Sequence, residues 1–92
     1  MPFEWDEKKN RQNLRKHGLS FEDAEIVFSS PMFTIEDTRS AYGEVRLISL
    51  GSLLGRVVVV AHTRRGDSSR IISMRKANAR ETKVYKEQFG EG

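Results

Sequence analysis

The spacing of apolar residues along the chain changes from a helical period to a strand period near residue 32. Phe21, Ala24, Val27 and Phe28 lie at the intervals that place residues on one face of a helix. From residue 32 onward, apolar and polar residues alternate or form short apolar runs, which is typical of strands. The order of the two patterns predicts helices first and a sheet afterwards.

A polar helix is predicted ahead of this apolar one. Asp6 is a suitable N-cap and Gly18 a suitable residue just beyond the C-terminus, so the helix should run to about His17. Leu14 is its only strongly apolar residue, so the helix has almost no stripe to bury. We expect it to lie on the surface or to make contacts through asparagine, lysine and arginine side chains.

Two further helices are indicated by their capping residues. Ser20 precedes the apolar stripe, and the Ser-Ser-Pro sequence at 29–31 should end that helix. Asn78, followed three residues later by Glu81, forms a capping-box pattern. The helix that starts there should reach about Phe89.

A short extended segment that holds Phe3 and Trp5 is predicted at the start of the chain, before the first helix. Four strands are predicted between the second and third helices. A polar loop at 38–43 and a glycine-bracketed turn at 51–55 separate them. The strands are expected at 32–37, 44–51, 56–64 and 69–76. Because helices and strands are segregated, we expect one α+β domain over residues 1–92, with helices on one face of an antiparallel sheet of three to four main strands.

The third predicted strand begins with four valines and ends with polar residues. Alternation of side chains places Val58, Val60, His62 and Arg64 on one face. The other face, with Val57, Val59, Ala61 and Thr63, is the better candidate for packing against the helices.

The register of the next strand leaves two arrangements open. If Arg64 pairs with Ser69, then Ser73 and Arg75 share the face of His62. A shift of one residue would bring Arg70, Met74 and Lys76 to that face instead. In either arrangement a histidine and at least two basic side chains share a surface.

Such a surface suits the cleavage of RNA by its own 2′-hydroxyl. That reaction needs a base, cations for the charge on phosphorus, and an acid for the leaving oxygen. We expect His62 as base or acid, and Arg64 and Arg75 as the phosphate-binding catalytic residues. Further RNA contacts are expected from the remaining basic side chains, namely Arg46, Arg65, Arg70, Lys76, Lys9 and Lys16.

Charge distribution favours a polyanionic partner. Residues 62–92 hold 8 Lys/Arg and 4 Asp/Glu, whereas residues 1–61 hold 8 Lys/Arg and 9 Asp/Glu. A basic segment attracts nucleic acid. A solvated basic face without a ligand remains the alternative explanation.

Other chemistries find little support in the sequence. There is no cysteine, the two histidines lack metal-ligand spacing, and the glycines form no phosphate loop, so we expect neither metal nor cofactor. Asp6, Glu36, Asp37 and Glu81 have simpler explanations as caps or loop acids. No secretory pattern opens the chain and the longest apolar run, at 57–61, is too short for a bilayer. A cytoplasmic location without membrane contact is expected.

Two separated motifs resemble the BrnT family, ribonuclease toxins of bacterial type II toxin–antitoxin systems. They are FEWDEKKNRQNLRKHGLSFEDAEIVF at the start of the chain and HTRRG with RIISMRKA near its end. The resemblance implies a RelE-like fold, in which helices cover one sheet face and the other takes RNA. It also implies metal-independent RNA cleavage that inhibits translation, and a ribbon–helix–helix antitoxin, with operator DNA bound only by the toxin–antitoxin complex.

Two alternatives to a ribonuclease stay open. One is a module that binds nucleic acid without cutting it, since the acid–base set is incomplete. The other is an inactive subunit that mainly holds the antitoxin. Both retain the basic surface, and only the first of them requires RNA or DNA binding.

Overall fold

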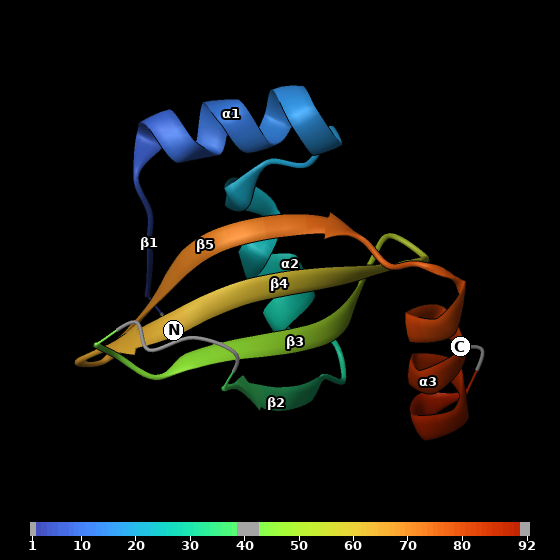
Figure 1. Ribbon diagram of the computed structural model, residues 1–92. Helices are drawn as coiled ribbons and strands as arrows, with labels where there is room; N and C mark the ends of the chain where they lie inside the picture. The colour runs from blue at the N-terminus through green and yellow to red at the C-terminus, as the bar shows by residue number, and fades with distance from the viewer. Residues whose placement is uncertain (1, 39–42, 91–92) are drawn as a thin grey trace.

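The computed structural model describes residues 2–38 and 43–90 of the chain (Figure 1). Within these ranges the α+β class is confirmed, with three α-helices and a five-stranded sheet. The elements are β1 (Phe3–Glu4), α1 (Glu7–His17), the 3₁₀ turn η1 (Phe21–Asp23), α2 (Ala24–Phe28), β2 (Phe33–Asp37), β3 (Arg46–Leu53), β4 (Arg56–Arg65), β5 (Ser68–Lys76) and α3 (Ala79–Phe89).

The sheet is mixed rather than purely antiparallel, and it has one strand more than predicted. Its order is β1-β5-β4-β3-β2, and β2 to β5 form the expected antiparallel meander. The additional strand, β1, runs parallel to β5, with Phe3 beside Ser69. A two-residue strand leaves no periodic signal, so the sequence showed only an extended segment. Most of the loop predicted at 38–43 lies outside the described residues.

Local capping signals produce the helix ends as predicted. Asp6 accepts hydrogen bonds from the backbone N–H groups of Lys8 (2.8 Å) and Lys9 (3.4 Å), and these bonds lower its carboxyl pKa. Gly18 closes α1 with φ of 71°, a left-handed conformation that glycine adopts without steric cost. The second helix differs from its prediction, because its first turn is the 3₁₀ turn η1 and α2 itself has only five residues.

Helix α1 is attached to the sheet through amides, which explains how it packs without an apolar stripe. Asn13 Nδ2 donates to the carbonyls of Leu19 and Met74 (both 2.9 Å), and its Oδ1 accepts from the Met74 N–H (3.1 Å). Asn10 Oδ1 accepts from the Phe21 N–H at 2.8 Å. Both side chains are buried, so these bonds satisfy backbone groups that water cannot reach.

The main core lies on the sheet face that holds Val58 and Val60, not on the face expected from the sequence. Phe21 and Val27 of η1 and α2 pack there, both fully buried. The opposite face carries a smaller cluster of Leu50, Val59 and Tyr85. Four consecutive valines make both faces apolar, so alternation alone could not identify which one the helices cover.

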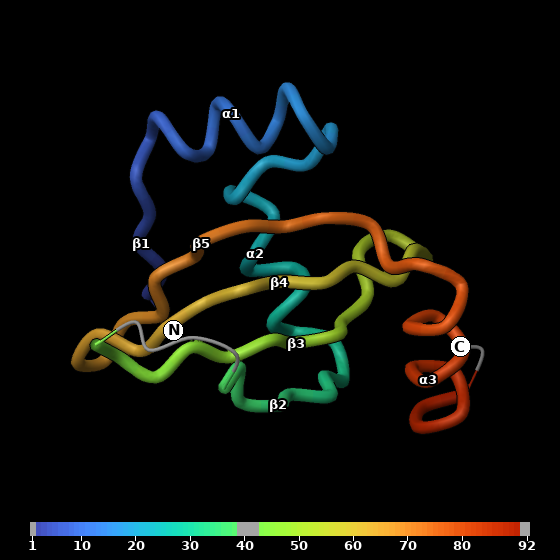
Figure 2. The backbone as a smooth tube through the Cα atoms, viewed as in Figure 1, coloured from blue at the N-terminus to red at the C-terminus, as the bar shows by residue number. Residues whose placement is uncertain are grey.

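The helices also divide between the two faces. Figures 1 and 2 show α1 above β5, α2 crossing the back of the strands, and α3 at the end of the sheet where β5 finishes. Tyr85 anchors α3 to the smaller cluster, and its hydroxyl donates to the Pro31 carbonyl at 2.9 Å. The expectation that all helices cover one face is therefore wrong for α3.

A β-bulge at Ile72 decides which side chains share a face. Arg64 pairs with Ser69 and His62 with Ile71, as in the first predicted register. The next pair is Ala61 with Ser73, so Ile72 is an extra residue in β5. Beyond it the side chains of β5 change sides relative to β4.

The bulge corrects the predicted grouping of basic residues. Arg75 now pairs with Val59 and Lys76 with Val58. Arg75 therefore lies on the face opposite His62, together with Ser73. The alternation rule assumes an uninterrupted ladder, and a single inserted residue reverses its result.

Candidate functional site

A pocket of about 270 Å³ lies on the sheet face opposite η1 and α2. The pairs Asp37–Arg46, Ala61–Ser73 and Val59–Arg75 bring residues of four strands to one patch of this face. The lining residues are Asp37, Arg46, Ile48, Val59, Ala61, Ile72, Ser73 and Arg75. Apolar residues combined with a few polar groups are the usual composition of a binding site, and this lining contains both kinds.

The polar groups of this pocket suit a phosphate flanked by a hydroxyl. Arg46 and Arg75 supply two guanidinium groups, which bind phosphate oxygens through paired N–H donors. Asp37 supplies a carboxylate that can accept a proton, and Ser73 supplies a hydroxyl. The Arg46 Nε atom, one of the three nitrogens of its guanidinium, is buried.

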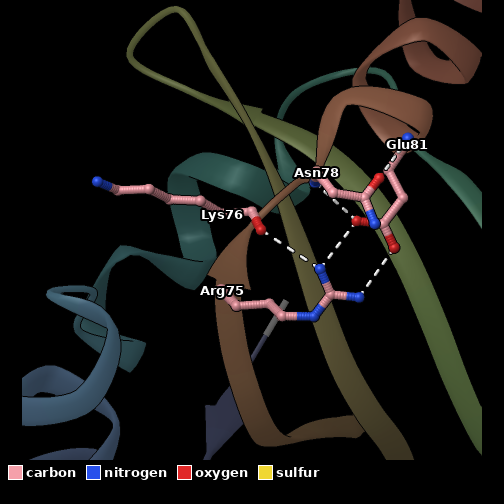
Figure 3. Close-up of polar contacts among 4 residues, drawn as sticks. All are labelled: Arg75, Lys76, Asn78 and Glu81. Carbon is pink, nitrogen blue, oxygen red and sulfur yellow. Dashed lines mark hydrogen bonds and ion pairs between the residues drawn. The ribbon is translucent and has the colours of Figure 1, made fainter.

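Arg75 is held by a bidentate ion pair to helix α3 (Figure 3). Its Nη1 and Nη2 atoms donate to Oε1 and Oε2 of Glu81, both at 2.8 Å. The hydrogen bonds from Arg75 lower the pKa of Glu81, so this carboxylate stays charged at neutral pH. In Figure 3 the Lys76 side chain extends away from this ion pair, as its place on the other face requires.

His62 belongs to the core rather than to this pocket. Its Nε2 lies 2.8 Å from the Ser49 hydroxyl, which lies 2.7 Å from the Thr34 hydroxyl. The ring packs edge-on against Phe28 with centroids 5.0 Å apart, and only 5% of the residue is exposed. Burial, together with the positive charge of Arg64, lowers the pKa of His62 from 6.5 to about 4.

This burial predicts a pH-dependent stability. The unfolded chain binds a proton at His62 below about pH 6.5, whereas the folded chain binds it only near pH 4. The contribution of neutral, buried His62 to the free energy of unfolding is therefore complete above pH 6.5. It falls by about 2 kcal/mol as the pH falls towards 4. Urea unfolding at pH 7 and pH 4.5 should show a smaller loss for His62→Gln, which does not titrate, than for the wild type. Equal losses in the two proteins would contradict this account.

The other basic residues expected at the site are spread over the surface around the hairpin. Arg64 is exposed at the end of the His62 face. Arg65 lies 3.8 Å from Glu44, and Arg70 lies 3.2 Å from Glu4 in an ion pair that links β5 to β1. The structure does not bring Arg64, Arg65 or Arg70 into the pocket with Arg75.

Lys9 and Lys16 of α1 lie closer to the pocket than their sequence positions indicate. They line a second hollow with Gln12, Asn13, His17, Ile72 and Ser73. Ile72 and Ser73 belong to both hollows, so the two meet at β5. Cations of the polar helix therefore flank the pocket across this strand.

Asp37 and Ser73 were missed as site residues by sequence reasoning. Asp37 had a simpler explanation as a loop acid, but it is the last residue of β2 and pairs directly with Arg46. The signal that could have identified it is this register, in which an acidic and a basic residue share a face. Glu81 was recognised only as part of a helix cap, since its contact with Arg75 depends on where α3 packs.

The described part of the chain contains neither a metal-binding cluster nor a membrane-spanning helix. In residues 2–38 and 43–90 no three His, Cys, Asp or Glu side chains gather as a group that could hold a metal ion. No helix in the same ranges is long and apolar enough to cross a membrane.

Comparison with known proteins identifies the family. The family model described as "Ribonuclease toxin, BrnT, of type II toxin-antitoxin system" matches residues 5–81, which is 77 of the 92 residues. No curated protein matches the chain. The matched region contains the polar helix, the whole sheet meander and the Arg75–Glu81 pair. The chain therefore belongs to the BrnT family of ribonuclease toxins of type II toxin–antitoxin systems.

Proposed function

We propose that this ribonuclease toxin is a metal-independent endoribonuclease that binds the scissile phosphate between Arg46 and Arg75. The observation that carries the proposal is the pocket that these two arginines line together with Asp37. For cleavage by the 2′-hydroxyl of the RNA itself, the carboxylate supplies the base and the two arginines supply the cations, while solvent supplies the acid. Inhibition of translation follows from the loss of intact RNA.

In the proposed mechanism the Asp37 carboxylate accepts the proton of the 2′-hydroxyl. The 2′-oxygen attacks the adjacent phosphorus, and Arg46 and Arg75 stabilise the negative charge of the phosphorane. The bond to the 5′-oxygen then breaks, and that oxygen takes a proton from solvent. The products are a 2′,3′-cyclic phosphate and a 5′-hydroxyl end, so no external nucleophile or redox partner is needed.

The remaining basic residues serve binding in this proposal. Lys9 and Lys16 contact neighbouring phosphates, because their hollow joins the pocket at β5. Arg64, Arg65, Arg70 and Lys76 provide weaker electrostatic attraction around the hairpin and at its far end. Of the three residues expected to be catalytic, Arg75 keeps that role, whereas His62 stabilises the core.

The proposed partner is a ribbon–helix–helix antitoxin. A type II system pairs its toxin with a protein antitoxin, and the family implies one here. In this proposal the antitoxin carries the DNA-binding part, so operator DNA is bound by the toxin–antitoxin complex, in the cytoplasm. Gel-shift assays with the toxin alone and with the complex test this division, and operator binding by the toxin alone would contradict it.

The decisive test is incubation of purified protein with RNA in EDTA. We expect cleavage at neutral pH, with 5′-hydroxyl ends that a polynucleotide kinase can label directly. The Arg46→Ala, Arg75→Ala double variant serves as the matched inactive protein. Cleavage that requires added Mg²⁺, or that is equal in the double variant, would overturn the proposal.

Burial of His62 favours a second candidate function, a module that binds RNA without cutting it. Among the described residues that line the pocket there is no histidine, the commonest acid–base side chain. This candidate predicts salt-dependent RNA binding with intact substrate after long incubation. The same EDTA experiment, followed on a denaturing gel, distinguishes the two functions.

A further inference from the structure

Helix α3 reaches the proposed phosphate pocket through one carboxylate. Glu81 lies in its first turn and holds both terminal nitrogens of Arg75 at 2.8 Å (Figure 3). The Arg75 side chain is 43% exposed and the Glu81 side chain 25% exposed, so the pair sits at the rim of the pocket rather than in the core. Arg75 Nη1 also donates to the Lys76 carbonyl at 3.3 Å, a longer hydrogen bond than either of the two to Glu81.

The carboxylate is itself anchored by the helix cap. Glu81 Oε1 accepts from the Asn78 N–H at 2.9 Å, while Asn78 Oδ1 accepts from the Glu81 N–H at 2.8 Å. This reciprocal capping box fixes both the backbone and the side chain of Glu81. The carboxylate therefore has little freedom to follow Arg75 if the arginine moves.

The sheet in turn holds the helix. Tyr85, one turn further along α3, is buried against Leu50 and Val59 and donates its hydroxyl hydrogen to Pro31. Val59 is the direct neighbour of Arg75 across β4 and β5. Val59 of the pocket lining therefore shares a buried cluster with Tyr85 of α3, and Glu81 of the same helix binds the Arg75 guanidinium.

We infer that Glu81 is a positioning residue, which acts on RNA cleavage only by holding the Arg75 guanidinium at the phosphate pocket. This inference rests on the proposed function of that pocket. Preorganised donors stabilise developing charge without reorganisation during the reaction. The orientation of Arg75 therefore affects the rate of cleavage more than it affects the affinity for the substrate.

If Glu81 competed with RNA for Arg75, its substitution would have the opposite effect on cleavage. A carboxylate resembles a phosphate in its bidentate contact with arginine, so the alternative role of Glu81 is that of a competitor for the substrate. If it competed, its neutralisation would raise RNA affinity and speed cleavage. If it positions Arg75, its neutralisation slows cleavage and leaves RNA affinity nearly unchanged.

Glu81→Gln is the informative variant, because glutamine also forms capping boxes and keeps the helix start intact. We expect kcat to fall about tenfold while KM changes by less than about twofold. Glu87→Gln, an exposed carboxylate of the same helix, is the matched control and should keep wild-type rates. In an Arg75→Ala background, Glu81→Gln should have no further effect, since the group it positions is gone.

Two kinetic outcomes would overturn the inference. Faster cleavage or tighter RNA binding in Glu81→Gln would identify a competitor. An equal loss in the wild-type and Arg75→Ala backgrounds would identify a purely structural role.

A measurement on the side chain itself separates this inference from the proposed function. Arginine ¹⁵N spectra should show separate Nη signals for Arg75 in the wild type, because the bidentate pair slows rotation of the guanidinium, and averaged signals in Glu81→Gln. Averaged signals in both proteins would overturn positioning. Separate signals in a wild type that cleaves no RNA would instead sustain the positioning and refute the proposed function.

Discussion

Replacing Arg75 with alanine is expected to slow RNA cleavage by about 100- to 1,000-fold, the usual cost of removing one donor that stabilises transition-state charge. The cause is the loss of a guanidinium that lines the pocket and is held by Glu81. Single-turnover kinetics of RNA cleavage, with EDTA present in excess, measure the effect directly. Arg46→Ala should lose a comparable factor, because its guanidinium lines the same pocket.

Two comparisons make this expectation specific. Arg80→Ala removes an exposed arginine from the first turn of α3 and should cleave RNA at the wild-type rate. Arg75→Lys should recover only part of the lost rate, because an ammonium group cannot bind two phosphate oxygens through a planar fork. Circular dichroism of each variant confirms that the fold is retained.

The outcome for His62 separates the two possible sites. His62→Gln should keep cleavage within a few-fold of the wild type, since the ring lies under Phe28 on the opposite face. A loss of cleavage rate as large as that of Arg75→Ala, in a protein of unchanged stability, would indicate that His62 belongs to the active site. It would also mean that the pocket around Arg46 serves only binding.

The second large effect concerns stability. Asn13→Ala should lower the free energy of unfolding by about 3 kcal/mol, because each buried polar group left without its partner costs about 1–3 kcal/mol. The substitution removes both donors and the acceptor that serve Met74 and Leu19. Urea denaturation at neutral pH gives the value.

Gln12→Ala is the matched control for this variant, since it removes an exposed amide from the neighbouring position of α1. Its effect should stay within about 0.5 kcal/mol, as for most surface substitutions. A loss below about 1 kcal/mol for Asn13→Ala would indicate that water replaces the amide. Helix α1 would then be held mainly by Asn10 and by the cap at Asp6.

Signals between residues close in sequence were read correctly. The caps at Asp6 and Asn78 and the left-handed Gly18 depend on hydrogen bonds and dihedral angles within a single turn, so neighbouring residues determine them. The antiparallel meander was predicted for a similar reason, because short turns join consecutive strands. The pairing of Arg64 with Ser69 is the first of the two registers that the sequence left open, and the structure decides in its favour.

The candidate site was predicted only in part. Arg75 and Arg46 were selected for their charge and their positions on strands, and both line the pocket. His62 was selected by its chemistry and its strand, yet it lies on the covered face. Asp37 was set aside, because its meeting with Arg46 and Arg75 requires three strands in a known register.

The sequence by itself therefore determined the main helices and strands, their order and the basic character of the last two strands, since these depend on local propensity and period. Only the tertiary structure decided which sheet face takes the helices and which side chains share the pocket. The physical reason is that one inserted residue, Ile72, reverses the alternation of β5, and four valines make both faces of β4 equally able to be buried. Packing of η1, α2 and α3 resolves that choice, and it also brings Glu81 to Arg75.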